Sequence, residues 1–389
     1  MQRVLLILPS ATYRAPDFLA AARSLGVEVV LASETEQTMA AAMGDRALVL
    51  PLDDPDASVA AILSLHGRSP VDAVVAADDG GTLIAAIAST ALGFAHNPPE
   101  AIATTRDKLA MRRAFAVAGV PQPRFAPDDA IAFPVVVKPV GLSASRGVIR
   151  VDDPDLLDAT IERVAGIADG PVITEEYVPG IEIALEGLLD EGRFRVLAVF
   201  DKPDPLVGPY FEETIYVTPS RLPEATLDEI GAVAAHAADA IGLREGPVHA
   251  EFRITPEGGI ATLELAARSI GGLCARTLRF GAGIALEEVI LRHALGMPFD
   301  DLAREHAAAG VMMLPIPRAG TLESVSGIDA ARAVPGVVGV ELTLRTGRPV
   351  VPLPEGDRYL GFVFARGTTP VVVEAALRTA ADQLDIVIR

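Results

Sequence analysis

Residues 249–266 read HAEFRITPEGGIATLELA, two runs rich in apolar residues on either side of the polar insert PEGG. A short insert with Pro and Gly between two such runs predicts a β-hairpin. A symmetric turn pairs Thr255 with Ile260 and Glu251 with Glu264. Directly opposed residues of an antiparallel pair point to the same face, with Cβ atoms about 5 Å apart. The stretch therefore predicts two glutamate side chains that stand side by side.

Two adjacent carboxylates repel each other, and a divalent cation removes that repulsion. Carboxylate oxygens suit Mg²⁺, which takes one or two protein carboxylates together with substrate phosphates. We therefore predict that Glu251 and Glu264 are ligands of Mg²⁺, with Mn²⁺ as an alternative metal. The competing interpretation is two solvated glutamates on an outer face, and a β-bulge would break the register on which the prediction depends.

A second motif is the apolar run 135–137 that ends at Lys138 and is followed by the loop GLSASRG at 141–147. A buried lysine is costly unless it meets an anion. A Gly/Ser loop presents backbone N–H groups that can hold phosphate. The Walker A order is absent, and no helix follows the glycines as a dinucleotide fingerprint requires. The motif predicts a phosphate-binding loop, with a plain hairpin loop as the alternative.

Two further segments are candidates for nucleotide contacts. In 173–182, ITEEYVPGIE, a strand leads into a connector whose backbone can hydrogen-bond a flat base, and Glu182 is placed to accept ribose hydroxyls. An ordinary polar linker is the alternative. At 105–108, TRDK opens a predicted helix that runs to residue 118. Basic residues at that end oppose the helix dipole, so we expect Lys108 to face an anion.

Composition limits the class of protein. The 389 residues are half hydrophobic, which allows two to four domains. A formal net charge of −19 repels phosphate backbones and excludes nucleic acid as an expected partner. Cys274 is the single cysteine, so no internal disulfide forms, which fits a reducing cytosol. The apolar run at 4–8 is too short for a signal peptide or a membrane span. We expect a cytoplasmic protein with no membrane partner.

The first hundred residues alternate apolar runs with helical patterns, which is typical of a parallel sheet covered on both faces. The predicted strands are 4–8, 27–32, 47–50 and 71–76, and the predicted helices are 18–25, 57–65 and 82–92. Asp78 and Asp79 follow the fourth strand at its carboxyl end, where open α/β sheets place ligands.

Taken in order, these motifs resemble the ATP-grasp superfamily over roughly residues 1–300. Within it the chain looks like the carboxylate–amine ligases, especially the L-amino-acid ligases that form dipeptides. The supporting stretches are ELAARSIGG at 264–272 and FGAGI at 280–284, and GTL at 320–322 and YLGF at 359–362 in the tail.

The resemblance implies an α/β ATP-grasp fold in five segments. They are an N-terminal parallel α/β domain (1–100), a helical linker (101–132), a lid subdomain (133–200), a central subdomain with the metal site (201–305) and a small C-terminal α+β domain (306–389). A homodimer is the oligomeric state that the resemblance implies.

The resemblance also assigns roles to residues. The expected ATP-binding residues are Lys108, Lys138, Ser143, Ser145, Arg146, Gly147, Glu175, Glu176, Tyr177, Val178 and Glu182. Arg268 would stabilise phosphoryl transfer and the tetrahedral intermediate, and His249 would contact substrate or phosphate. We expect an amino-acid pocket at Lys202, Glu213 and Arg276. Many family members carry Asn two residues after the second metal glutamate, where this chain has Ala266, which puts a two-metal arrangement in question.

The predicted activity is an ATP-dependent ligation of a small carboxylate to a small amine, such as two amino acids, through an acyl phosphate. ADP and phosphate would be released. The alternatives are a biotin-carboxylase-like enzyme that uses bicarbonate and a non-catalytic nucleotide-binding regulator. The motifs name neither the carboxylate nor the amine, and they do not distinguish an α-linked from a γ-linked product.

Overall fold

The computed structural model describes residues 1–10, 12–36, 43–127, 131–299 and 301–389. The N-terminal domain is a four-stranded sheet in the order β3-β2-β1-β4, in which every pair is parallel. Its strands are β1 (Arg3–Ile7), β2 (Glu28–Ser33), β3 (Ala47–Val49) and β4 (Ala73–Ala76), and its helices include α1 (Ala15–Leu25), α3 (Pro55–Arg68) and α4 (Asp79–Leu92). All five residues of β1 are buried, as expected of a strand covered on both faces. The predicted α/β layer is confirmed.

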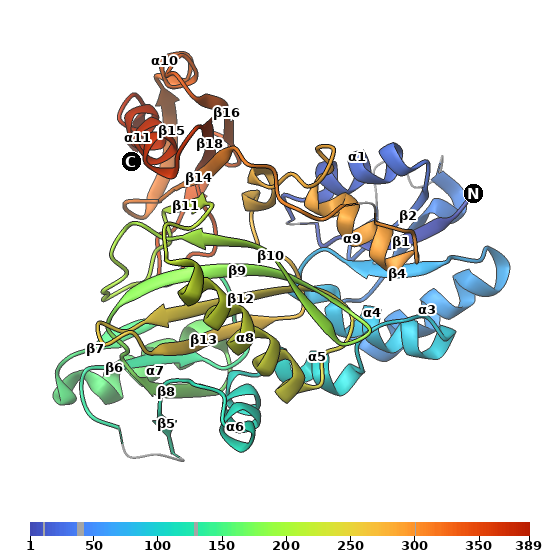
Figure 1. Cartoon of the computed structure of the whole chain (residues 1–389), viewed down its shortest axis with the longest axis horizontal. Helices are drawn as coiled ribbons and strands as arrows, with labels where there is room; N and C mark the ends of the chain where they lie inside the picture. The colour runs from blue at the N-terminus through green and yellow to red at the C-terminus, as the bar shows by residue number, and fades with distance from the viewer. Residues whose placement is uncertain (11, 37–42, 128–130, 300) are drawn as a thin grey trace.

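The centre of the molecule is an eight-stranded sheet in the order β13-β12-β9-β10-β11-β14-β18-β16, with antiparallel pairing throughout. Figure 1 shows its long central strands side by side beneath the C-terminal elements. The strands are β9 (Ile181–Asp190), β10 (Arg193–Asp201), β11 (Ile215–Thr218), β12 (Gly246–Ile254), β13 (Ile260–Ala266), β14 (Ala308–Leu314), β16 (Val337–Leu342) and β18 (Gly361–Gly367).

A separate four-stranded sheet, in the order β5-β8-β6-β7, forms the lid together with helix α7. The elements are β5 (Phe125–Ala126), β6 (Val135–Pro139), β7 (Ile149–Val151), α7 (Leu157–Ala168) and β8 (Val172–Glu176). The predicted lid range, 133–200, therefore extends too far, because β9 and β10 pair in the central sheet and not in the lid. Strand alternation alone does not say which sheet a strand joins.

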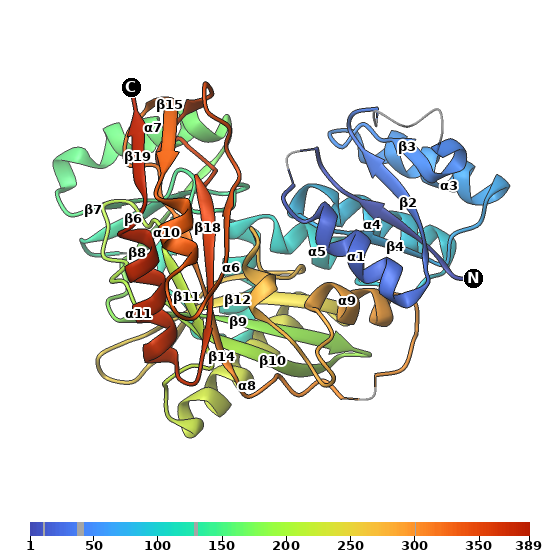
Figure 2. The same cartoon turned by 90° about the horizontal axis from the view of Figure 1, so that it is seen from above.

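The helices and the C-terminal elements fill the space around these sheets. They are α5 (Pro99–Thr105), α6 (Lys108–Ala118), α8 (Glu224–Ile241), α9 (Leu286–Ala294), β15 (Gly320–Ser326), α10 (Ile328–Arg332), β17 (Pro349–Val350), α11 (Pro370–Ala381) and β19 (Asp385–Ile388). In Figure 2 the N-terminal domain lies on the right, and the lid and the C-terminal elements lie on the left.

The predicted helix 105–118 begins later than expected. The chain leaves α5 at Arg106 and starts again at Lys108, with Asp107 accepting a hydrogen bond from the Ala110 N–H at 2.8 Å. This N-cap satisfies one of the free N–H groups of the first turn. It also places Lys108 in that first turn, where the sequence predicted an anion.

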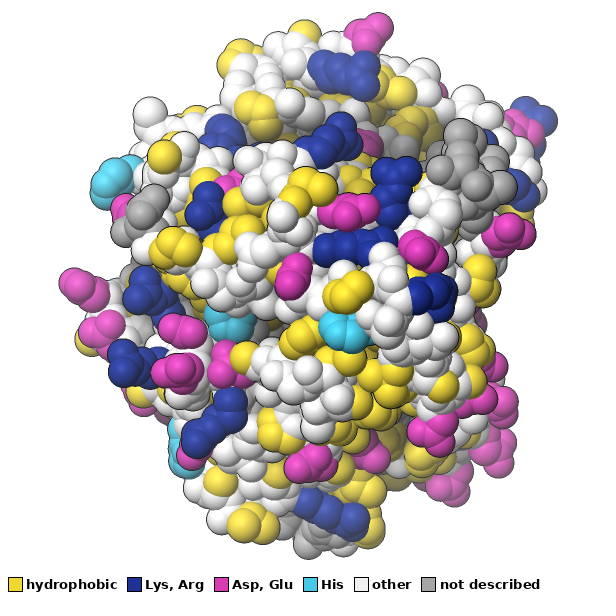
Figure 3. All heavy atoms as spheres, turned by 90° about the vertical axis from the view of Figure 1, so that its right-hand side faces the viewer, with side chains coloured by type: hydrophobic (Ala, Val, Ile, Leu, Met, Phe, Trp, Pro, Cys, Tyr) yellow, Lys and Arg dark blue, Asp and Glu magenta, His cyan; other side chains and the backbone are white. Residues whose placement is uncertain are grey.

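The surface mixes charges of both signs. On the face drawn in Figure 3, Lys and Arg side chains are interspersed with Asp and Glu. Among the helices that the structure describes, none combines the length and the apolar character that a membrane crossing requires.

Candidate functional site

A cavity of about 560 Å³ lies where the lid, the hairpin β12–β13 and the loops of the N-terminal domain meet. That volume is within the usual range for small-molecule sites. Most of the predicted site residues border it: Lys108, Lys138, Ser143, Ser145, Arg146, Glu175, Glu176, Tyr177, Val178, Glu182, Glu213, His249, Glu251, Glu264 and Arg268. Of the predicted set, which the structure describes in full, Gly147, Lys202 and Arg276 do not border it.

The predicted pairing of Glu251 with Glu264 is confirmed, although the register near the turn is not the predicted one. Ile254 pairs with Ile260, where the symmetric turn would have placed Thr255, and a bulge between the 251–264 and 252–262 pairs restores the alignment. The extra residue is Leu263, whose carbonyl accepts a 2.6 Å hydrogen bond from buried Arg112. The bulge therefore preserves the face-to-face glutamates that it was expected to destroy.

Lys202 lies beneath the cavity and joins three of its carboxylates. Its Nζ is 2.8 Å from Glu182, 2.5 Å from Glu213 and 2.9 Å from Glu251. Burial alone would lower the pKa of Lys202, but the three carboxylates raise it well above its usual value. Burial also raises the pKa of Glu213, to about 7. The structure gives this 3% exposed ammonium three carboxylate partners, and its predicted contact with substrate stays a prediction.

Glu175 holds two cations at the wall of the cavity. Its side chain is 1% exposed, and its oxygens lie 2.6 Å from Arg112 Nε and 2.7 Å from Lys138 Nζ. Burial would raise the pKa of Glu175, but Arg112 and Lys138 outweigh it and lower that pKa to about 2. The carboxylate fixes Lys138, the residue before the last of β6, so that this strand places a cation at the cavity.

Arg253, which sequence reasoning missed, organises the connector after β8. It donates to the Val178 carbonyl at 3.0 Å and to Glu182 at 2.9 Å. Its guanidinium also lies over the ring of Tyr177, 5.3 Å from the centroid. The signal available in the sequence was an arginine between the apolar residues Phe252 and Ile254, since a buried charge needs partners.

His249 pairs with Ala266 across the hairpin and contacts two carboxylates. Its Nδ1 is 2.6 Å from Glu186, and its Nε2 is 3.4 Å from Glu251. Burial would lower the pKa of His249, but the bonds and charges of these two glutamates raise it to about 9. The imidazole is therefore cationic at neutral pH and faces the same side as the paired glutamates.

Arg268 faces the cavity from the segment after β13. Its Nε donates to Asp79 at 2.9 Å, and its Nη1 donates to the Ser269 carbonyl. The Asp79 charge holds the pKa of Arg268 above its ordinary value against the opposing effect of burial. Asp78 and Asp79 also border the cavity, at the carboxyl end of β4 as the sequence predicted.

The Gly/Ser loop lies over the cavity in an unusual backbone conformation. Ala144 and Ser145 have φ values of 57° and 54°, in the left-handed region. Lys108 Nζ donates to the Leu142 carbonyl at 2.6 Å, so this lysine approaches the loop directly. Gly147 instead donates its N–H to Pro354 of the C-terminal domain at 2.8 Å. Two lysines and the loop thus converge on one end of the cavity.

Arg276 lies away from the cavity and links domains. Its Nε donates to Asp17 of α1 at 2.9 Å, and its Nη1 pairs with Glu341 of β16. Arg14, which the sequence analysis did not single out, borders the cavity instead and bonds to Ser269 at 2.8 Å and to Glu287 at 3.2 Å. Arg14 directly precedes α1, and no sequence pattern there would have revealed this position.

The paired glutamates fit a hard divalent cation. Both are partly exposed to the cavity, at 20% for Glu251 and 28% for Glu264, and both offer oxygen donors. Their charge is balanced by ammonium groups, Lys202 at 2.9 Å and Lys108 at 3.5 Å. The Ala266 side chain offers no donor, so the protein would contribute two carboxylates to such a site, a number that Mg²⁺ commonly accepts.

Three family models match the chain. Residues 19–96 match the ATP-grasp N-terminal domain, residues 131–277 the ATP-grasp domain, and residues 312–389 the L-amino acid ligase C-terminal domain 2. The matches follow the order of the three structural regions described above.

The similarities to curated relatives and to solved structures agree with these family models. An uncharacterized protein from Sinorhizobium fredii is 28% identical over 74% of this chain and 62% of its own length. Alanine–anticapsin ligase from Bacillus subtilis is 26% identical over 61% of this chain and 57% of its own length. The chain thus spans about three-fifths of the length of these relatives. The crystal structure of an L-amino acid ligase from Bacillus licheniformis has a TM-score of 0.82 at 25% identity, covering 100% of this chain and 99% of that one.

Proposed function

The chain is an ATP-grasp protein that resembles the L-amino-acid ligases, and we propose that it joins a carboxylate to an amine at the expense of ATP. The observation that supports this proposal most directly is that Glu251, Glu264, Lys108 and Lys138 all line one cavity. This arrangement offers oxygen ligands for a metal beside cations for phosphate. It is the charge distribution that phosphoryl transfer requires.

The nucleotide would lie between the lid and the hairpin. Lys108, Lys138 and the loop 143–147 would hold its phosphates, and the connector at Tyr177 and Val178 would border its base. The carbonyl of Val178 is bound to Arg253, so the connector is held in place before ATP arrives. Glu182 would accept the ribose hydroxyls with its conformation fixed by Lys202 and Arg253.

Glu251 and Glu264 would hold Mg²⁺, with Mn²⁺ as the alternative. When bound, the ion would neutralise charge on the phosphate oxygens during transfer. Two neighbouring side chains would also neutralise negative charge on the phosphates. His249 is cationic at neutral pH, and Arg268 remains charged at all physiological pH values. A single ion suits this donor set better than two, since position 266 carries alanine.

The reaction proceeds in two balanced steps. A carboxylate oxygen of the first substrate attacks the γ-phosphorus, the bond to the β–γ bridging oxygen breaks, and ADP leaves. The amine of the second substrate then attacks the acyl carbon, the acyl–oxygen bond breaks, and phosphate leaves as the amine loses a proton. Arg268 is placed to stabilise the oxyanion between these events. The lid would exclude water that would otherwise hydrolyse the acyl phosphate.

The amino-acid end of the cavity would lie around Glu213. This side chain is 17% exposed, and the neighbouring cavity wall includes Tyr216, Met313 and Tyr359. A carboxyl group with aromatic and thioether neighbours suits a substrate that carries both an ammonium group and an apolar side chain. This favours amino acids as substrates over bicarbonate, which has neither.

The test measures phosphate release with Mg-ATP and pairs of amino acids, with mass spectrometry of the products. We expect release only when both amino acids are present, with a condensation product of matching mass. Glu251→Gln and Glu264→Gln should each lower kcat/KM by about a hundredfold or more, as the loss of charge-stabilising groups does. Glu257→Gln, in the exposed turn of the same hairpin, is the matched control and should keep wild-type activity.

Other results of these assays would support one of the alternative functions. Release that depends on bicarbonate and free biotin would point to the carboxylase alternative. ATP binding without turnover for any pair would point to a regulator. Wild-type activity in both hairpin variants would contradict the proposed metal site.

A further inference from the structure

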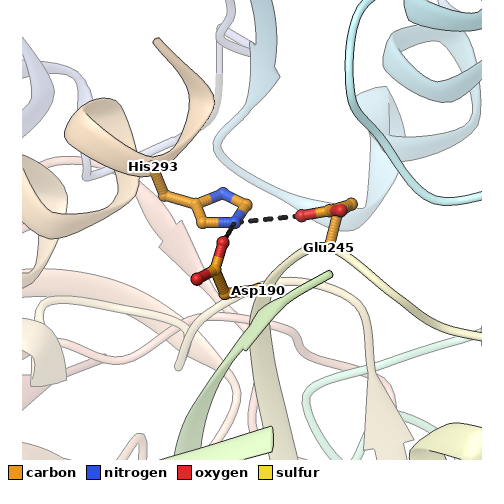
Figure 4. A group of neighbouring side chains, drawn as sticks. All are labelled: Asp190, Glu245 and His293. Carbon is orange, nitrogen blue, oxygen red and sulfur yellow. Dashed lines mark ion pairs between the residues drawn. The ribbon is translucent and has the colours of Figure 1, made fainter. Parts of the chain in front are cut away.

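A second group of metal-ligating side chains lies outside the cavity, where α9 meets the end of β9 (Figure 4). Asp190 ends β9, Glu245 directly precedes β12, and His293 lies in the last turn of α9. His293 Nε2 is 3.1 Å from Glu245 Oε2 and 3.8 Å from Asp190 Oδ1. One ligand atom from each residue lies within 4.8 Å of the others. These three residues do not border the 560 Å³ cavity.

The separations are close to those around a small metal ion. Bonds of about 2.0–2.1 Å in a tetrahedral site place neighbouring ligand atoms roughly 3.3 Å apart. The 3.1 Å between His293 and Glu245 is close to this separation, and the 3.8 Å between His293 and Asp190 is somewhat longer. The side chains of His293 and Glu245 are 10% and 16% exposed, whereas that of Asp190 is 68% exposed. An ion could therefore enter from solvent and keep one water ligand on that side.

The two less exposed residues of the group, Glu245 and His293, are fixed by contacts with neighbouring residues. Asn97 accepts hydrogen bonds from the backbone N–H groups of Arg244 and Glu245 and donates one to the Glu245 carbonyl at 2.6 Å. Helix α9, which carries His293, packs its buried Leu286 and Ile290 in the same core as Phe18 of α1. The site thus joins residues of the central sheet to a helix that is fastened to the N-terminal domain.

We propose that Asp190, Glu245 and His293 bind a single Zn²⁺ ion, which ties the central sheet to the N-terminal domain. An imidazole nitrogen with two carboxylates favours zinc and related transition metals over Mg²⁺, which prefers oxygen ligands alone. The role is structural, because the ligands come from three separate elements and lie outside the reaction cavity. The proposal does not rest on the ligase activity.

The test is isothermal titration of the full chain with ZnCl₂. We expect a Zn²⁺ site in the wild type whose affinity His293→Gln and Glu245→Gln each weaken by at least about tenfold, a loss of roughly 1.4 kcal/mol. His236→Gln changes an exposed histidine of α8 and should leave binding unchanged. Glu251→Gln should also leave it unchanged, which separates this site from the carboxylates of the cavity.

A second readout does not depend on binding heat. Zn²⁺ should raise the Tm of the wild type and of the two control variants, but not that of His293→Gln, because an ion that binds only the folded state stabilises it. The proposal is overturned if the wild type binds no Zn²⁺, if His293→Gln binds Zn²⁺ as tightly as the wild type, or if Glu251→Gln abolishes binding. Circular dichroism without metal verifies that each variant is folded.

Discussion

At the scale of single residues, the floor of the cavity depends on one lysine that compensates three carboxylates. Lys202 is 3% exposed and contacts Glu182, Glu213 and Glu251. Removing one partner of a buried ionic cluster leaves uncompensated charge, at a cost of about 3–5 kcal/mol. We expect Lys202→Met to lower the free energy of unfolding by about that amount in urea titrations without metal.

Added metal should restore part of that loss, because a divalent cation among the three carboxylates replaces the missing charge. Millimolar MnCl₂ or MgCl₂ should therefore raise the Tm of Lys202→Met more than that of the wild type. The control is Arg195→Met, which removes a cation from an exposed position of β10. Equal metal responses in all three proteins would show that the carboxylates do not share a cation site.

The pKa of Glu175 gives a pH prediction with a definite sign. Because the folded state lowers that pKa from 4.5 to about 2, the charged carboxylate stabilises the fold above pH 4.5. That contribution is lost as the pH falls from 4.5 towards 2, and its full size is about 3 kcal/mol. The difference in unfolding free energy between the wild type and Glu175→Gln should therefore shrink as the pH falls from 5 to 3. A difference that stays constant over this range would contradict the paired geometry.

At the scale of elements, the C-terminal domain holds the lid. The loop after β17 accepts the Gly147 N–H at Pro354, and Glu355 lies 2.6 Å from Arg163 of α7. Both side chains of this ion pair are more than two-fifths exposed, so the pair contributes at most about 1 kcal/mol. So weak a contact on this side can break when substrate is exchanged, while the buried pair of Arg112 and Glu175 still holds strand β8.

Loosening this contact should affect nucleotide binding before it affects chemistry. We expect Glu355→Gln and Arg163→Gln to raise the KM for ATP up to about fivefold while kcat stays near the wild-type value. Steady-state kinetics with Arg195→Gln as the surface control measures this. A KM equal to that of the control in both variants would mean that the ion pair plays no part in lid closure.

The elements also show how far sequence reasoning reaches. The N-terminal strands and helices were predicted with shifts of a few residues at their ends, because their apolar runs have one clear period. The hairpin register near the turn was wrong, since a bulge at Leu263 is stabilised by Arg112, a partner 151 residues away in sequence. The sheet to which β9 and β10 belong was also misassigned. Periodicity identifies an element, whereas its partners depend on tertiary contacts.

At the scale of the whole molecule, the predicted segments do not pack as separate units. One hydrophobic cluster contains Phe18 of the N-terminal domain, Phe200 of the central sheet and Phe362 of the C-terminal domain. Because the regions share one core, most candidate site residues could be predicted from motifs, but the residues that hold them in place could not. The motifs that contact ligand recur along the chain in order, but Arg112 and Arg253 act through contacts that exist only once the regions have packed together.

Substitution of Arg276 tests whether contacts between the regions stabilise the whole molecule. From its sequence this arginine was predicted to line the amino-acid pocket, whereas in the structure it binds Asp17 of α1 and Glu341 of β16. If it acts as a link between regions, Arg276→Gln should lower the Tm by a few degrees, as the loss of about 1 kcal/mol does in a chain of this size, and leave the KM for amino acids unchanged. Asp17→Asn should give a similar shift in Tm, since it removes one of the same bonds. A rise in the KM for an amino acid in Arg276→Gln, with no such rise in Asp17→Asn, would return this arginine to the substrate pocket. The double variant adds a further criterion, because two changes within one network should destabilise the protein by less than the sum of their separate effects.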